Sequence, residues 1–153
     1  MFIYVVYKDP PELSLLCPRG SEMYDTSVEK TLLVNPVCPV RIILEYIRKQ
    51  CRLGIFTHFD LADDNGCLMG LFNLPTYAYA TDQFEHKRTY FIIVFKEVDK
   101  RLEVLPQLNY ENKMHFDLKM RVKRFLMVGD VSTSTMTMGF SAHQASKMTV
   151  KKK

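Results

Sequence analysis

The sequence has no long hydrophobic run and no closely spaced cysteine pair. Its apolar runs, such as Tyr90 to Phe95, are far shorter than the ~18 residues that a membrane-spanning helix needs. The four cysteines are Cys17, Cys38, Cys51 and Cys67. They form no Cys-x-x-Cys pair and have no histidine at zinc-ligand spacing, so we expect reduced thiols and no metal site. The first residues also lack the basic start of a signal peptide. These absences favour a cytoplasmic protein that does not bind membranes.

Catalytic motifs are lacking as well. The chain contains no Gly-x-Ser-x-Gly elbow, no Walker-type glycine loop and no His-Glu-x-x-His motif. Asp60, Asp63 and Asp64 lie close together, but they lack the alternating oxygen ligands and the downstream glutamate of a calcium loop. We interpret Asp63 and Asp64 as turn residues. The sequence therefore predicts no enzyme, no cofactor and no small-molecule substrate.

Positive charge is concentrated at the C-terminal end. The whole chain has a formal net charge of +4, yet residues 113–153 carry nine Lys or Arg against two Asp, a net of +7. A basic end of this kind suits an acidic partner, and the alternative is a solvated tail that aids solubility. The residues that we predict to bind a partner are Lys119, Arg121, Lys123, Arg124, Lys151, Lys152 and Lys153.

One amphipathic helix is predicted over residues 39–53. Its expected buried stripe consists of Val40, Ile43, Leu44, Ile47 and Cys51, which recur at helical spacing. Pro39 suits the first turn, and Gly54 suits the left-handed residue that often follows a helix. One stripe is enough to cover one face of a sheet.

The flanking segments predict the strands of that sheet. Residues 1–8 and 30–35 indicate paired strands, and residues 88–98 form an apolar run typical of a central strand. Between apolar segments, Asn65 and Gly66 predict a hairpin turn, because both tolerate a positive φ angle. The predicted class is α+β.

A further strand is predicted near the C-terminal end. Apolar side chains alternate with polar ones from Met114 to Val122, which is the period of a half-buried strand. Such a strand must join the domain's own sheet edge, pair within the tail or pair with another protein. The structural alternative is an extra strand, or a segment packed on the domain, with no role in binding. Residues 131–153 have little to bury and predict an extended or disordered end.

Three segments, "MFIYVVYK", "KTLLVNPVCPVRIILEYIRKQCRLG" and "RTYFIIVFK", resemble the strands and helix of the ubiquitin-like β-grasp superfamily. Within it, "LVN", the helix and "DLADDNG" resemble a family of small uncharacterised open-reading-frame proteins of ciliated animals. This resemblance implies a β-grasp domain at residues 1–99 with an insertion at 9–29, followed by a basic extension at 100–153. It also implies an association with cilia. No Gly-Gly follows the last grasp strand, so conjugation to other proteins is not expected.

These observations lead to three hypotheses. The first is a non-enzymatic protein-interaction module of the ciliary or flagellar axoneme, whose basic segment meets axonemal proteins or the acidic surface of tubulin. The second is a soluble cytosolic ubiquitin-like adaptor that binds a signalling or degradation partner through its sheet. The third is nucleic-acid binding by the tail, which the lack of interleaved stacking aromatics disfavours.

Overall fold

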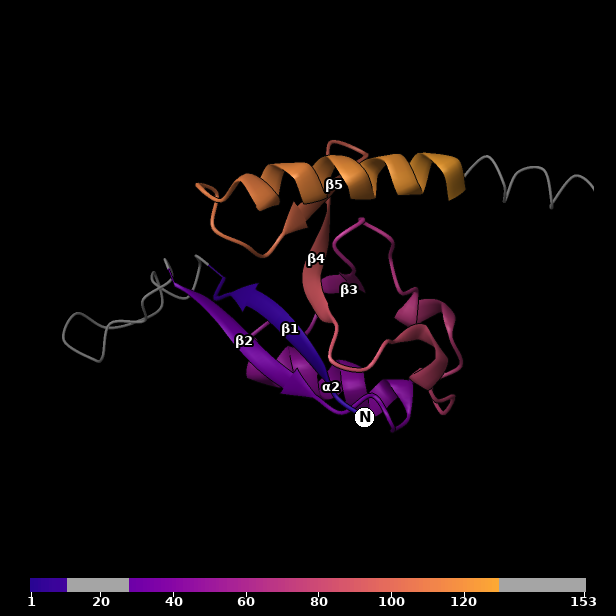
Figure 1. The fold of residues 1–153 in the computed structure, drawn as a ribbon. Helices are drawn as coiled ribbons and strands as arrows, with labels where there is room; N and C mark the ends of the chain where they lie inside the picture. The colour runs from indigo at the N-terminus through magenta and orange to yellow at the C-terminus, as the bar shows by residue number, and fades with distance from the viewer. Residues whose placement is uncertain (11–27, 130–153) are drawn as a thin grey trace, which may run out of the picture.

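Five strands form one mixed sheet with a helix against each face (Figure 1). The computed structural model describes residues 1–10 and 28–129. Within these ranges the strands are β1 (Ile3–Lys8), β2 (Glu29–Val34), β3 (His58–Ala62), β4 (Thr89–Val98) and β5 (Arg101–Pro106). The helices are α2 (Val40–Gln50) and a C-terminal helix of residues 113–129. The short 3-10 helices η1 (Leu71–Asn73) and η2 (Thr81–Gln83) lie between β3 and β4. The predicted α+β class is confirmed.

Strand β4 is the centre of the sheet. The strand order is β2-β1-β4-β3, and β5 also pairs with β4. β1 and β4 run parallel, while the other pairs are antiparallel. The predicted pairing of the first strand with residues 30–35 and the predicted central place of residues 88–98 are both confirmed.

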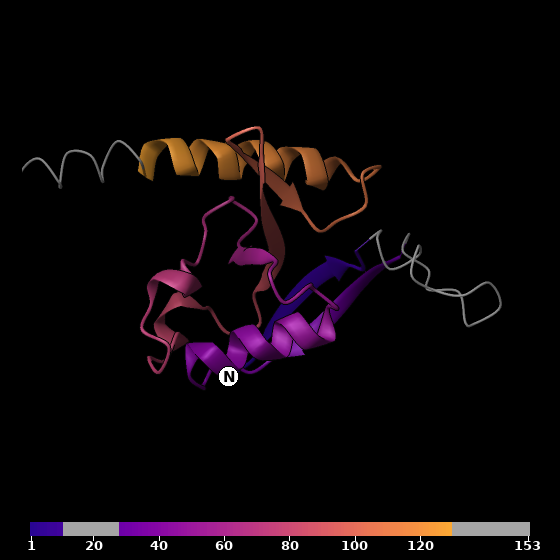
Figure 2. The ribbon, with the colours of Figure 1, turned by 180° about the vertical axis from the view of Figure 1, so that it is seen from behind.

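The side chains of β4 alternate between two hydrophobic cores. Tyr90, Ile92 and Val94 pack with α2 in the first core. Phe91 and Ile93 pack with the C-terminal helix in the second core. The view from behind shows the sheet between the two helices (Figure 2). A strand buried on both faces requires an almost continuous apolar sequence, which explains the run from Tyr90 to Phe95.

Helix α2 covers its sheet face as the sequence predicts. Of the expected stripe, Val40, Ile43, Ile47 and Cys51 are buried and Leu44 is half-buried. The helix ends earlier than predicted. The left-handed residue after it is Arg52, with a φ of 54°, so the assignment of that conformation to Gly54 is wrong.

The strand predicted over residues 114–122 is also wrong, because this segment is helical. Its inward residues are His115, Leu118 and Val122, and Leu126 packs against the same core. They recur every three or four residues, which is the helical period. The structural alternative of a segment packed on the domain is the one observed.

Two expected features, the insertion and the basic extension, lie partly outside the described residues. Residues 11–27 of the expected insertion lie outside them, as do residues 130–153 with Lys151, Lys152 and Lys153. The expected boundary between residues 99 and 100 falls in the tight turn that joins β4 to β5. After this turn, β5 hydrogen-bonds to β4 and the C-terminal helix completes the second core.

Candidate protein-interaction surface

The C-terminal helix has two apolar faces, and only one of them is buried. Phe116, Met120 and Met127 lie opposite the buried stripe and are 65%, 48% and 70% exposed. Their spacing of four and seven residues places them in one line along the helix. We call them the helix stripe. An aligned set of exposed apolar side chains is typical of a protein-binding surface.

Basic residues flank this stripe. At 100° per residue, Lys123 falls on one side of it, and Lys113 and Arg124 fall on the other. Lys113 and Arg124 are exposed, and neither forms an ion pair with the residues that the structure describes. Lys113 was absent from the sequence prediction, although its helical spacing to Phe116 and Met120 would have indicated it once the helix was known.

The other predicted binding residues of this helix contact the protein itself. The Lys119 ammonium lies 3.8 Å from a carboxylate oxygen of Glu103 on β5. The guanidinium of Arg121 donates a 2.6 Å hydrogen bond to the backbone carbonyl of Asp64. Lys123 is half-buried beside the β4–β5 turn. Among the four predicted residues on this helix, Arg124 is therefore the one that is exposed and makes no ion pair with the described residues.

The turn at Asn65 and Gly66 presses against this helix. Gly66 has a φ of 82°, and a Cβ atom there would lie 2.5 Å from the Cβ of Arg121 and 2.9 Å from the backbone nitrogen of Val122. Asp63 holds the turn by accepting hydrogen bonds from the backbone N–H groups of Asn65 and Cys67. The prediction that Asp63 is a turn residue is confirmed. The turn fixes the helix at its middle.

Arg88 anchors the same turn from the other side. Its guanidinium contacts carboxylate oxygens of Asp63 at 3.1 Å and Asp64 at 3.0 Å, and it also pairs with Glu85. The hydrogen bond from Arg88 lowers the pKa of Asp64 and raises that of Arg88. These charges are matched within the protein, so the cluster has a structural role.

His115 is the polar member of the buried helix face. Its Nε2 atom has no hydrogen-bond partner among the described residues, and its ring centroid lies 4.8 Å from that of Tyr110. Burial lowers the pKa of His115, and the charges of Lys119 and Lys8 lower it further. A neutral imidazole packs here as a nearly apolar ring.

Buried Asp60 also has a structural explanation. Its carboxylate accepts hydrogen bonds from the backbone N–H groups of Leu61, Gly70 and Leu71, at 2.8, 2.7 and 3.3 Å. Burial nevertheless raises its pKa. These bonds tie β3 to η1.

Residues 1–10 and 28–129 offer neither a metal site nor a membrane-spanning helix. They contain no group of three or more His, Cys, Asp or Glu side chains placed to hold a metal ion. No helix in this part of the chain has the length and apolar character to cross a membrane.

A family model described as "Putative Interleukin 2 receptor, gamma chain" (Il2rg) matches residues 27–112. The chain belongs to the Il2rg family. No curated protein and no solved structure matches this chain. The Il2rg match runs from β2 through β5 and ends one residue before the C-terminal helix. The helix stripe therefore lies outside the residues that the family model matches.

The family match corrects the recognition made from the sequence. The predicted membership in the ubiquitin-like superfamily, and in the family of small open-reading-frame proteins of ciliated animals, is wrong, because the model that matches is that of Il2rg. The fragments quoted for that resemblance are short strand and helix patterns. Many α+β folds can share such patterns.

Proposed function

We propose that the chain is a non-enzymatic protein-interaction module of the cytoplasm, and that its C-terminal helix docks on an acidic protein surface. The proposed setting is the ciliary or flagellar axoneme, with tubulin or a microtubule-associated protein as the partner. The setting rests on charge alone, since the surface of tubulin is acidic and residues 113–153 carry a net of +7.

The observation that carries this proposal is the helix stripe with its basic flanks. Phe116, Met120 and Met127 supply apolar area in one line, and Lys113 and Arg124 supply charge beside it. Amphipathic helices bind apolar grooves through such lines of anchors, and complementary charges at the rim speed and orient the encounter. The opposite face of this helix is fixed to the sheet, so binding does not require the helix to fold first.

We also propose that the sheet has β-grasp topology. The order β2-β1-β4-β3, the parallel central pair and helix α2 against one face support it. This proposal concerns topology and implies no membership in the ubiquitin-like superfamily. In it, β5 and the C-terminal helix are additions that cover the second face.

Co-sedimentation with stabilised microtubules tests the proposed function. The variant Met120→Ser/Arg124→Glu changes one stripe residue and one flanking charge, both of them exposed. We expect it to bind at least about tenfold more weakly than the parent chain at low salt, which corresponds to about 1.4 kcal/mol. The matched control is Lys49→Glu, an exposed charge reversal on α2 across the sheet, and it should bind like the parent.

Two further conditions sharpen this test. Microtubules from which a protease has removed the acidic tubulin tails should bind the parent chain more weakly, and added salt should lessen the effect of Arg124→Glu. Equal losses for the helix variant and the α2 control would contradict the proposal. Displacement of the chain by RNA but not by salt would favour the nucleic-acid alternative.

The family's description supplies a second candidate, a receptor chain. The Il2rg match over residues 27–112 favours it, because the description of this family names the gamma chain of the interleukin 2 receptor. Carbonate extraction of membranes from expressing cells separates the two candidates. Retention in the extracted membranes would support the receptor chain, and release would support the interaction module.

A further inference from the structure

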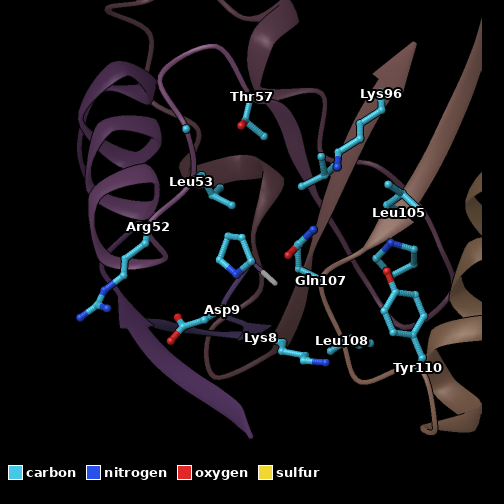
Figure 3. Close-up of a pocket in the computed structure, with 14 residues that line it drawn as sticks. Lys8, Asp9, Arg52, Leu53, Thr57, Lys96, Leu105, Gln107, Leu108 and Tyr110 are labelled. Atoms are coloured by element: carbon cyan, nitrogen blue, oxygen red, sulfur yellow. The ribbon is translucent and has the colours of Figure 1, made fainter. Parts of the chain in front are cut away.

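A pocket of about 400 Å³ opens between the end of α2 and strand β5 (Figure 3). This volume lies within the range of about 300 to 1,000 Å³ that is usual for ligand sites. Its apolar lining comes from Leu53 after α2, Val94 on β4, Leu105 on β5 and Leu108 beyond it. Three stretches of the chain, around residue 53, around residue 94 and at residues 105–108, therefore share one apolar cavity.

Basic side chains surround this cavity. Lys8, Arg52 and Lys96 belong to its lining, and the Lys96 ammonium points inward while the Arg52 guanidinium points away from the cavity (Figure 3). The carboxylate of the lining is that of Asp9, which is buried and paired with Lys30 at 2.5 Å. The charged lining residues other than this paired carboxylate are therefore basic.

The wall formed by residues 53–57 is held by hydrogen bonds. The backbone N–H of Leu53 donates to the carbonyl of Arg48 at 3.0 Å, and that of Thr57 donates to the carbonyl of Gly54 at 2.9 Å. The Arg48 guanidinium donates to the carbonyls of Gly54 and Thr57 and so joins the two ends of this turn. A preformed wall reduces the entropy that a ligand must overcome.

The turn in this wall presents two exposed apolar side chains. Ile55 and Phe56 are 79% and 96% exposed, next to the lining residues Gly54 and Thr57. Residues 48–57 contain three Lys or Arg and no acidic residue. Apolar area at the rim of a pocket with basic lining residues is complementary to a segment that carries both apolar side chains and carboxylates.

We propose that this pocket and the turn at Ile55 and Phe56 form a second docking site, whose ligand is an acidic peptide segment of a partner protein with apolar side chains at its centre. An apolar side chain of the peptide fills the cavity between Leu53 and Leu105. Its neighbouring carboxylates meet Lys8 and Lys96, and another apolar side chain covers Phe56. The site is separate from the helix stripe. It binds a peptide segment in a pocket, whereas the helix stripe binds a partner through the exposed face of a helix.

Fluorescence anisotropy with defined peptides tests the site. The probes are fluorescein-labelled Glu-Glu-X-X-Glu-Glu peptides in which X is Leu, Phe, Ile or Val, with Ser-Ser at the centre or Lys in place of every Glu as controls. We expect saturable binding of at least one acidic apolar peptide and none of the controls. Phe56→Ser and Lys96→Glu should each weaken that binding about tenfold, and Lys96→Glu should gain affinity for the Lys peptide of the same centre.

Separate controls distinguish this site from the proposed function. Arg124→Glu should leave peptide binding unchanged while it weakens microtubule binding, and Phe56→Ser should do the reverse. Failure of every acidic peptide to bind, or binding that ignores both Phe56→Ser and Lys96→Glu, would overturn the proposal. Two other results would also overturn the proposal. One is self-association of the chain, seen by sedimentation velocity and abolished by Phe56→Ser. The other is binding of the chain to phosphatidylserine vesicles that the same variant abolishes.

Discussion

Replacement of Gly66 by alanine should destabilise the protein in two separable ways. Gly66 has a φ of 82°, and an L-residue in this region costs about 1 to 2 kcal/mol. The added Cβ would also lie 2.5 Å from the Cβ of Arg121 and 2.8 Å from its backbone carbon. Overpacking of this kind costs about 1 to 3 kcal/mol, because helix backbone cannot rotate away as a flexible side chain can. The expected loss in the free energy of unfolding is therefore about 2 to 5 kcal/mol.

Gly70 provides the matched control for this prediction. Its φ of 66° is similar, but a Cβ atom there would meet Asn73 only at 3.6 Å, an ordinary contact. Gly70→Ala should thus cost only the conformational term of about 1 to 2 kcal/mol. Urea unfolding followed by circular dichroism measures both losses. If Gly66→Ala and Gly70→Ala lost the same stability, the turn would not press on the C-terminal helix and the packing argued above would be refuted.

Two further predictions concern the second core. Truncation after Asp99 tests the expected domain boundary. Because the truncation removes β5 together with Leu118 and Val122, we expect the shortened chain to bind a hydrophobic dye and to lose its cooperative thermal melt. A sharp melt would instead support an independent domain at residues 1–99. Burial lowers the pKa of His115 below its usual 6.5, so its contribution to stability is complete above about pH 6.5 and is lost as the pH falls through the lowered value. Melting temperatures between pH 7 and pH 5 should therefore fall more steeply for the parent than for His115→Phe, and parallel slopes would contradict the burial of a neutral imidazole.

The sheet and α2 were predictable because their signals are local and consistent. Val40, Ile43 and Ile47 fit one helical face, and the run from Tyr90 to Phe95 fits a strand buried on both faces. The β4–β5 hairpin was not predicted from the sequence, because its turn lacks the usual local signal. Its turn residues Asp99 and Lys100 both have positive φ angles, of 51° and 62°, without the glycine that usually marks such a turn.

The C-terminal helix was misread because two periods fit the same residues. Met114, Phe116, Leu118, Met120 and Val122 alternate as in a strand. His115, Leu118 and Val122 are the residues that the fold buries, and counting histidine as polar concealed this helical stripe. Leucine, methionine, lysine and arginine are also good helix formers, so propensity favoured the helix over the strand.

The pocket beside α2 had no sequence signal. Its lining comes from β1, the segment after α2, β4 and the segment from β5 to Tyr110, and no motif joins these positions. Only the folded chain brings Leu53 close to Leu105. The exposed pair at Ile55 and Phe56 is likewise ordinary in sequence, and it becomes informative once the structure shows that neither side chain is buried.

Coverage of both faces of the central strand β4 restricts how this protein can bind others. An adaptor that recognises partners through a sheet needs an open face, but α2 packs on one side of β4 and the C-terminal helix on the other. Among the described residues, exposed apolar side chains lie on outer helix faces and at turn tips, such as Phe116 on the helix stripe and Phe56 on the turn after α2, and also on the outer strands, such as Leu33 on β2. The two proposed sites are also joined by a short path, because Tyr110 lines the pocket and contacts the ring of His115 at the start of the C-terminal helix. A chain built in this way can hold two segments of a larger assembly at a fixed distance, which is what a structural interaction module requires.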